Sequence, residues 1–127
     1  MRLRPPEYSD YGWMVEAYKD WPKGITTAHD VAKLLRRWIE RGDPVCLVAE
    51  LNEPVGLMTY RQQFFGVWIH NLLVRPEYRY QGHSKTMLNL LKAKLVADGA
   101  MVAGFKPLDG PYKGRYPDDR FTWNMEI

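Results

Sequence analysis

The residues of this chain whose types and order could do chemistry are concentrated between Leu72 and Leu91. An apolar strand is expected to end at Arg75-Pro76, and a short loop then brings Gly82 to the start of an amphipathic helix. The first turn of a helix carries amide N–H groups with no partner inside the helix, at the positive end of the helix dipole. Glycine has no side chain to keep a ligand away from the backbone. The segment therefore predicts a site for an anionic, phosphorylated ligand.

Other reactive residue types lack the neighbours that metal binding or nucleophilic catalysis would need. His29, His70 and His83 have no partner of ligand character three or four residues away, so no metal site is expected. The single cysteine, Cys46, lies inside the apolar run Val45–Ala49 and is expected to be a buried packing residue. With one cysteine no intrachain disulfide can form, which fits a reducing compartment such as the cytoplasm.

Two helices are expected in the N-terminal third of the chain. Ser9-Asp10 offers caps for a helix over residues 11–20. In the second helix, Thr27 with Asp30 three residues later resembles a capping box, and Gly42 lies just past the end. Between them runs an apolar stripe with helical spacing, formed by Val31, Leu34, Leu35, Trp38 and Ile39.

The remaining segments predict strands and one further helix. Turn residues and period-two patterns favour strands at 1–5, 45–51, 55–63, 67–74, 101–105 and 120–127. A helix over 84–98 has an apolar inner face, whereas residues 106–119 hold Gly and Pro turns and no helical stripe. This order predicts a mixed α/β fold of the α+β type. At 127 residues, the whole chain, 1–127, is expected to form a single domain.

The loop and its flanking elements resemble the acetyl-CoA signature of the GCN5-related N-acetyltransferases, the GNAT superfamily. The matching pattern is Leu72-x-Val74-x-Pro76-x-x-Arg79-x-x-Gly82-x-Ser84. The family has Gly or Ala where this chain has Ser84, a change that still permits close backbone approach. The resemblance is specific over roughly residues 44–105. It implies a central mixed, mostly antiparallel sheet flanked by helices, with the last family helix replaced here by a loop at Pro107–Asp119.

The resemblance implies that acetyl-CoA is the co-substrate and that this segment holds it. The backbone of Leu72 and Val74 would pair with the pantetheine arm as an added strand would. Backbone N–H groups within Tyr80–Lys85 would donate to the pyrophosphate. The cofactor-binding residues implied in this way are Leu72, Leu73, Val74, Arg79, Tyr80, Gln81, Gly82, His83, Ser84 and Lys85.

The resemblance also implies direct attack of an amine on the thioester, with a backbone N–H near Leu73 or Val74 stabilising the oxyanion. Many relatives place a glutamate base two residues before the Leu of the Leu-x-Val element, and His70 holds that position here. The reference pKa of histidine, about 6.5, suits a base for an ammonium proton. On a regular strand, His70 would share a face with Trp68, Leu72 and Val74. The alternative is a half-buried histidine bonded to a neighbour.

Relatives commonly reprotonate the CoA thiolate with a tyrosine beyond the fourth strand counted from the sequence. Tyr112 and Tyr116 lie in the corresponding stretch and are the candidates implied here. The alternative is that each is a surface packing residue between glycines and prolines.

Composition and charge narrow the choice of partners. An apolar fraction of 46% with 26% charged residues is ordinary for a soluble globular protein. No apolar run approaches the roughly 20 residues that span a bilayer, and the N-terminus lacks the apolar core of a signal peptide. A net charge of +3 is too small to predict nucleic-acid binding. We therefore expect a cytoplasmic protein with no nucleic-acid or membrane partner, whose sheet edge could support a homodimer.

The sequence therefore predicts an N-acetyltransferase that moves an acetyl group from acetyl-CoA to a primary amine of a small molecule or a protein. Two alternatives stay open. The first is a non-catalytic acyl-CoA-binding or scaffolding protein of the same fold, which the base position and the missing helix favour. The second is a structural or interaction protein with no ligand, with the aromatic first helix as its contact surface.

Overall fold

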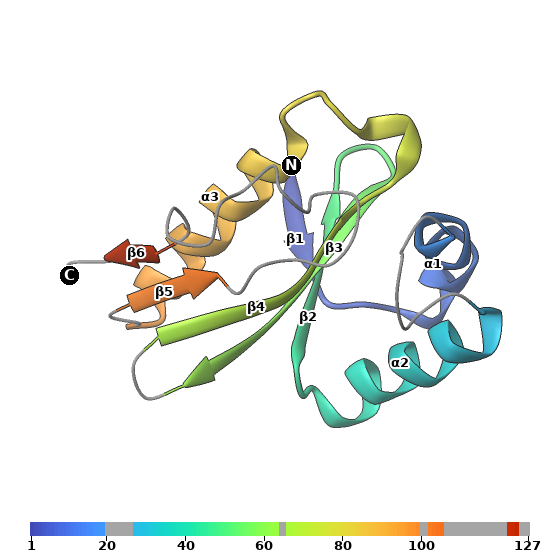
Figure 1. Ribbon diagram of the computed structural model, residues 1–127, viewed down its shortest axis with the longest axis horizontal. Helices are drawn as coiled ribbons and strands as arrows, with labels where there is room; N and C mark the ends of the chain where they lie inside the picture. The colour runs from blue at the N-terminus through green and yellow to red at the C-terminus, as the bar shows by residue number, and fades with distance from the viewer. Residues whose placement is uncertain (20–26, 64–65, 100–101, 106–121, 125–127) are drawn as a thin grey trace.

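The computed structural model describes residues 1–19, 27–63, 66–99, 102–105 and 122–124 (Figure 1). The helical elements are η1 (Tyr8–Asp10), α1 (Tyr11–Tyr18), α2 (Ala28–Arg41), η2 (Pro76–Tyr78) and α3 (His83–Ala97). The strands are β1 (Arg2–Arg4), β2 (Val45–Glu50), β3 (Pro54–Gln63), β4 (Gly66–Val74), β5 (Val102–Phe105) and β6 (Thr122–Asn124). The loop expected at Pro107–Asp119 lies outside the described residues.

The strands form one sheet in the order β1-β2-β3-β4-β5-β6. Neighbouring strands are antiparallel except β4 and β5, which are parallel because α3 lies between them in the chain. Figure 1 shows α3 on one side of this sheet and α1 and α2 on the other. The predicted fold class, a mixed and mostly antiparallel sheet flanked by helices, is confirmed.

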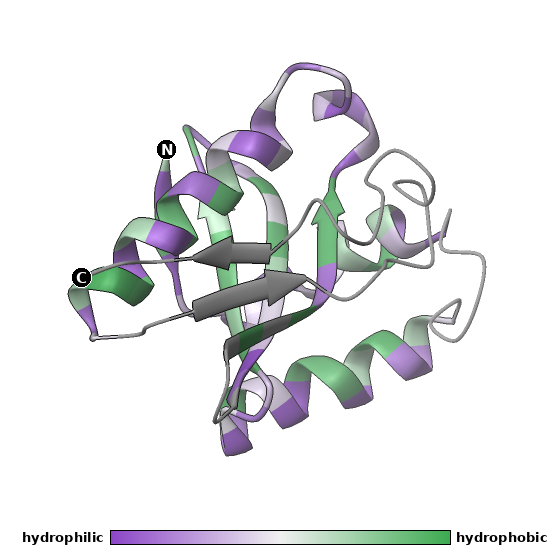
Figure 2. Cartoon of the chain, turned by 60° about the vertical axis from the view of Figure 1, so that its left-hand side comes forward, coloured by the Kyte–Doolittle hydropathy of each residue, from purple (hydrophilic) through white to green (hydrophobic). Residues whose placement is uncertain are grey.

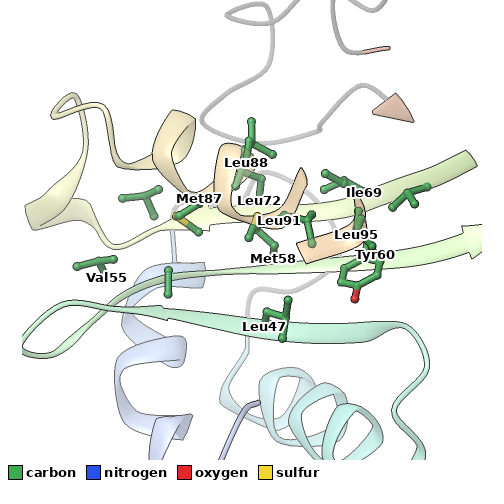
Figure 3. Packing of buried hydrophobic residues seen from close by; sticks show 13 residues of the cluster. Leu47, Val55, Met58, Tyr60, Ile69, Leu72, Met87, Leu88, Leu91 and Leu95 are labelled. Atoms are coloured by element: carbon green, nitrogen blue, oxygen red, sulfur yellow. The ribbon is translucent and has the colours of Figure 1, made fainter. Parts of the chain in front are cut away.

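Each face of the sheet has its own apolar core. On the α3 face, strand side chains pack against Met87, Leu88, Leu91 and Leu95 (Figure 3). On the other face, α1 and α2 cover Cys46, Val48, Leu57 and Leu73. In Figure 2 the residues of α2 alternate between hydrophilic and hydrophobic along the helix, as expected for one face on the sheet and one in solvent. The prediction that Cys46 is a packing residue is confirmed, and burial raises the pKa of its thiol.

The helix ends follow the sequence signals only in part. Thr27 caps α2 because its Oγ1 accepts from the Asp30 N–H at 3.1 Å, and Gly42 ends this helix at φ +62°. The Asp30 carboxylate accepts from the Thr27 hydroxyl at 2.6 Å rather than from the backbone N–H that a full capping box would use. Asp10 stands at the N-cap of α1, but its side chain makes no cap bond there, so that expectation is wrong.

Asp10 instead holds β1 to the start of α1. Its buried carboxylate accepts from Arg4 Nη2 at 2.8 Å and Nη1 at 3.0 Å, from Trp13 Nε1 at 2.9 Å and from the Glu7 N–H at 2.8 Å. Arg4 also donates through Nε to Glu50 at 2.7 Å. Burial alone would raise the pKa of Asp10, but the hydrogen bonds from Arg4, Trp13 and Glu7 outweigh burial and hold this pKa below its usual value.

We expect Asp10→Asn to lower the free energy of unfolding by about 3 kcal/mol, the lower end of the range for breaking a buried pair, because Arg4 keeps Glu50. A carboxylate whose pKa is lower in the folded state than in the unfolded state stabilises the folded protein. This stabilisation is fully present above the unfolded-state pKa, about 4, and is lost as pH falls through the folded-state pKa. Below about pH 4, the free energy of unfolding of the wild type should therefore decrease more steeply with falling pH than that of Asp10→Asn. Urea unfolding at several pH values measures both effects.

The matched control is Glu16→Gln, since Glu16 is exposed and, among the described residues, pairs with Lys19 at the surface. This change should cost less than about 1 kcal/mol. An Asp10→Asn variant as stable as Glu16→Gln at neutral pH would contradict the role assigned to Asp10.

Candidate active site

A β-bulge interrupts β4 at His70. Tyr60 of β3 pairs with Ile69, and the preceding residue, Thr59, pairs with Asn71, so His70 has no partner residue on β3. Ile69 and Leu72 both lie in the core beneath α3 (Figure 3), although three positions separate them. One extra residue in a strand shifts the alternation of side chains between the two faces of the sheet by one position.

Because of this bulge, the expectation that β4 is a regular strand is wrong. Side chains alternate between the two faces of the sheet on each side of the bulge. Ile69 lies on the α3 face, so the next residue, His70, is directed to the α1 and α2 face. Leu72 and Val74 also lie on the α3 face, so Asn71, which precedes Leu72, is directed to the α1 and α2 face as well. His70 therefore does not share a face with Leu72 and Val74. It is half-buried and stands where the strand changes its alternation.

A side-chain hydrogen bond fixes the pairing beside the bulge. Asn71 Nδ2 donates to Thr59 Oγ1 at 2.7 Å, and Thr59 is fully buried. A buried polar pair of this kind keeps one register, because slipping would leave both groups unsatisfied. Neither residue stood out in the sequence, since a polar residue within a strand usually indicates only a solvent-facing position.

On the side of β4 away from β3, strand pairing stops at the bulge. β5 pairs with β4 at Trp68 and Ile69, and within the described residues no strand pairs with that side of β4 beyond Ile69. Figure 1 shows β4 continuing past β5 toward η2. Among the described strands, the sheet is therefore open along the second half of β4.

Backbone direction decides which amide groups face this opening. The Leu73 carbonyl points to Gly56 of β3, and the Arg75 N–H donates to Val55 O at 2.8 Å. Because amide groups alternate along a strand, those of Leu72 and Val74 point away from β3. Of the two positions expected to supply an oxyanion donor, Val74 has its N–H directed to the opening, and Leu73 does not.

Gly56 allows β3 to lie this close to β4. A Cβ at this position would overlap the Leu73 carbonyl oxygen and would lie 3.1 Å from the Val74 Cα. We expect Gly56→Ala to destabilise the protein by about 1–3 kcal/mol, because only backbone movement could relieve the overlap. Urea unfolding measures this cost.

Gly12→Ala provides the control for that substitution. Apart from its chain neighbours and the backbone of its own helix, α1, no atom of the described residues lies within 4 Å of a Cβ at Gly12. Alanine there should be neutral or stabilising by up to about 1 kcal/mol. Equal effects of the two substitutions would contradict the close approach at Gly56.

The loop after β4 reaches α3 through two residues with positive φ. Tyr80 has φ +62° and is 83% exposed, and Gly82 has φ +81° at the N-cap of α3. Apart from its chain neighbours, no atom of the described residues lies within 4 Å of a Cβ at Gly82, so the space in front of it is open. The loop residues predicted from the sequence, 79–85, are thus brought together around the first turn of a helix, the backbone arrangement that binds anions.

Hydrogen bonds from side chains and from one backbone N–H fix the loop to its flanking elements. Arg79 Nε donates to Val74 O at 2.8 Å, and Gln81 Nε2 donates to Glu77 O at 3.1 Å. The Thr86 N–H and hydroxyl both donate to Gly82 O at 3.2 Å. The loop is therefore tied to β4 at one end and to α3 at the other.

Arg75 connects this loop with α1. Its guanidinium lies 5.9 Å from the ring centres of both Trp13 and Tyr78 and forms an ion pair with Glu77 at 2.7 Å. Tyr78 in turn meets His83 edge-on, with 5.9 Å between ring centroids. Sequence reasoning missed this connection, because Trp13 and Arg75 are brought together only by the tertiary fold.

Tyr112 and Tyr116 lie outside the described residues. Within the described part of the chain, no group of three or more His, Cys, Asp or Glu could hold a metal ion. No helix of that same part is long and apolar enough to cross a membrane.

A family model described as "Acetyltransferase (GNAT) family" matches residues 11–107. No curated protein sequence matches the chain. The open sheet and the loop therefore lie within a segment that has a recognised family pattern.

Solved structures with low sequence identity share the fold. An acetyltransferase from Thermus thermophilus aligns at a TM-score of 0.66 and 19% identity, over 82% of this chain and 73% of that one. A GNAT family acetyltransferase from Brucella melitensis, in complex with acetyl-CoA, gives 0.62 and 15%, over 87% and 78%. The PaiA N-acetyltransferase from Thermoplasma acidophilum, in complex with coenzyme A, gives 0.57 and 16%, over 82% and 77%.

Proposed function

This chain belongs to the Acetyltransferase (GNAT) family, and from that membership we propose that it moves an acetyl group from acetyl-CoA to a primary amine by direct attack. The acceptor is a small amine or an amine of a protein. We further propose that the whole chain acts as one catalytic domain in the cytoplasm.

The loop and α3 supply the phosphate-binding half of the proposed site. The amide groups of the first turn of α3 and the positive φ of Gly82 suit the approach of pyrophosphate oxygens. Lys85 is exposed and forms no ion pair within the described residues, so its charge can serve an anionic ligand. Relatives solved with coenzyme A or acetyl-CoA support the same ligand class.

The opening along β4 is the observation that carries the proposal. An extended pantetheine arm has amide groups that can pair with a strand, and the amides of Leu72 and Val74 point to this side. The bulge at His70 lies at the end of the opening that is farther from the loop. A pantetheine arm running along β4 from the loop would place its thioester there.

The proposed reaction assigns one task to each group. The amine nitrogen forms a bond to the thioester carbon while the carbonyl electrons move onto oxygen, which a backbone N–H of β4 directed to the opening stabilises. Collapse of this adduct breaks the C–S bond. His70 takes the ammonium proton, and the CoA thiolate takes a proton from Tyr112 or Tyr116. The product is an amide, and no covalent enzyme intermediate forms.

A test of this function combines two readouts. The protein is incubated with acetyl-CoA and a panel of polyamines, aminoglycosides and lysine-containing peptides, while thiol release and the mass of the acceptor are followed. We expect an acceptor to gain one acetyl group for each thiol released. Acetyl-CoA binding without turnover would favour the non-catalytic acyl-CoA-binding alternative, and absence of binding would favour the protein with no ligand.

A further inference from the structure

The exposed face of α2 carries a concentration of cations around a surface hollow of about 520 Å³. The titratable groups that line this hollow are Lys33, Arg36, Arg37, Arg41, His29 and Glu40. The first four are exposed within little more than two turns of one helix. We call these four residues the α2 basic surface.

The cations of this surface are not used in ion pairs. None of the four forms a salt bridge within the described residues, although Arg37 Nε donates to Asp43 O at 2.9 Å. Elsewhere cationic side chains are commonly paired, as are Arg2, Arg4, Lys19, Arg61, Arg75 and Lys94. The opposite face of α2 already anchors the helix through Val31, Leu35 and Trp38. The fold therefore does not require these charges.

The α2 basic surface belongs to the same side of the sheet as His70. α2 packs on Leu57 and Leu73, and the bulge directs His70 to that face. The opposite face is covered by α3. A molecule held by α2 is therefore on the same side of the sheet as the face to which the bulge directs the proposed base.

We propose that the α2 basic surface docks an acidic segment of a protein or peptide acceptor, whose amine is then acetylated; this inference rests on the proposed function. Charge complementarity requires an anionic partner. The reaction requires an amine, which a peptide offers and a nucleic-acid backbone does not.

The test uses the full chain without acetyl-CoA, so that failure of the cofactor site cannot affect it. Fluorescence anisotropy follows a labelled hexaglutamate peptide ending in lysine, with a hexaglutamine peptide of the same length as reference. We expect the glutamate peptide to bind more tightly and to lose affinity as salt is raised. Arg36→Glu should weaken its binding by about fivefold or more.

Lys94→Glu is the matched control, because it changes net charge equally at an exposed cation of α3, outside both the α2 basic surface and the proposed phosphate loop. It should leave peptide binding unchanged, and thermal unfolding of both variants shows that they fold. Equal binding of the two peptides, equal weakening by both variants, or tighter binding of a single-stranded oligonucleotide of similar charge would overturn the proposal. Peptide binding that depends on Arg36 but gives no acetylated lysine when acetyl-CoA is added in a separate incubation would support docking and count against the proposed reaction.

Discussion

Gly82→Glu should abolish the thermal stabilisation that acetyl-CoA gives to the wild-type protein. A ligand at 100 times its dissociation constant stabilises by about 2.7 kcal/mol, which corresponds to a shift of about 10 °C for a domain of this size. A glutamate at Gly82 would place its carboxylate in the open space before α3, where it competes with phosphate for the same N–H groups. Thermal unfolding with and without acetyl-CoA measures the shift.

Gly99→Glu is the control for this substitution. Gly99 also has positive φ, +89°, with no atom within 4 Å of a Cβ, but it lies beyond the other end of α3. The free energy of unfolding of both variants should fall by about 1–2 kcal/mol because of backbone strain. Only Gly99→Glu should keep the rise in melting temperature with acetyl-CoA. An unchanged shift in Gly82→Glu would place the cofactor elsewhere, and no shift in the wild type would refute acetyl-CoA as the ligand.

His70→Ala should lower kcat by about 100-fold or more without changing the thermal shift with acetyl-CoA, because a general base contributes about 10²–10⁴-fold. His70 lies at the bulge and not in the phosphate loop, so cofactor binding should not depend on it. The measurement is thiol release with the best acceptor from the amine panel, for wild type and variant across pH.

Two further readouts separate a proton acceptor from a structural residue. Added imidazole should restore part of the activity of His70→Ala, since the truncated side chain leaves room for it. The difference between wild type and variant should also shrink as pH approaches the pKa of the acceptor amine, which is then neutral before it binds. A kcat within about threefold of the wild type at neutral pH would exclude His70 as the base.

The sequence predicted the local parts of the fold well because their signals are local. The caps at Thr27 and Gly42 and the strand–loop–helix unit around Gly82 depend on neighbours within a few residues. For the same reason the loop proposed to hold phosphate could be identified from residue types alone, including the glycine at positive φ. The corresponding elements of the structure differ from the expected bounds by one or two residues where both are described.

The bulge could not be predicted from the order of residues around His70. The pattern Ile69-His-Asn-Leu72 is compatible with either face for His70, and pairing with Thr59 and Tyr60 decides between them. The open edge beyond Ile69 depends in the same way on where β5 stops pairing. Register is a property of two strands, so one strand's sequence leaves it undetermined.

By itself, the sequence determined the fold class through the order of its elements. It also determined the ends of α2 and the conformation of the loop before α3, which we propose binds phosphate, because both rest on short-range backbone geometry. Only the tertiary structure decided that His70 faces α1 and α2, that Asp10 holds Arg4 rather than capping α1, and that Gly56 must lack a side chain. These three features depend on contacts between separate elements. Such contacts exist only once the sheet has assembled and brought the elements together.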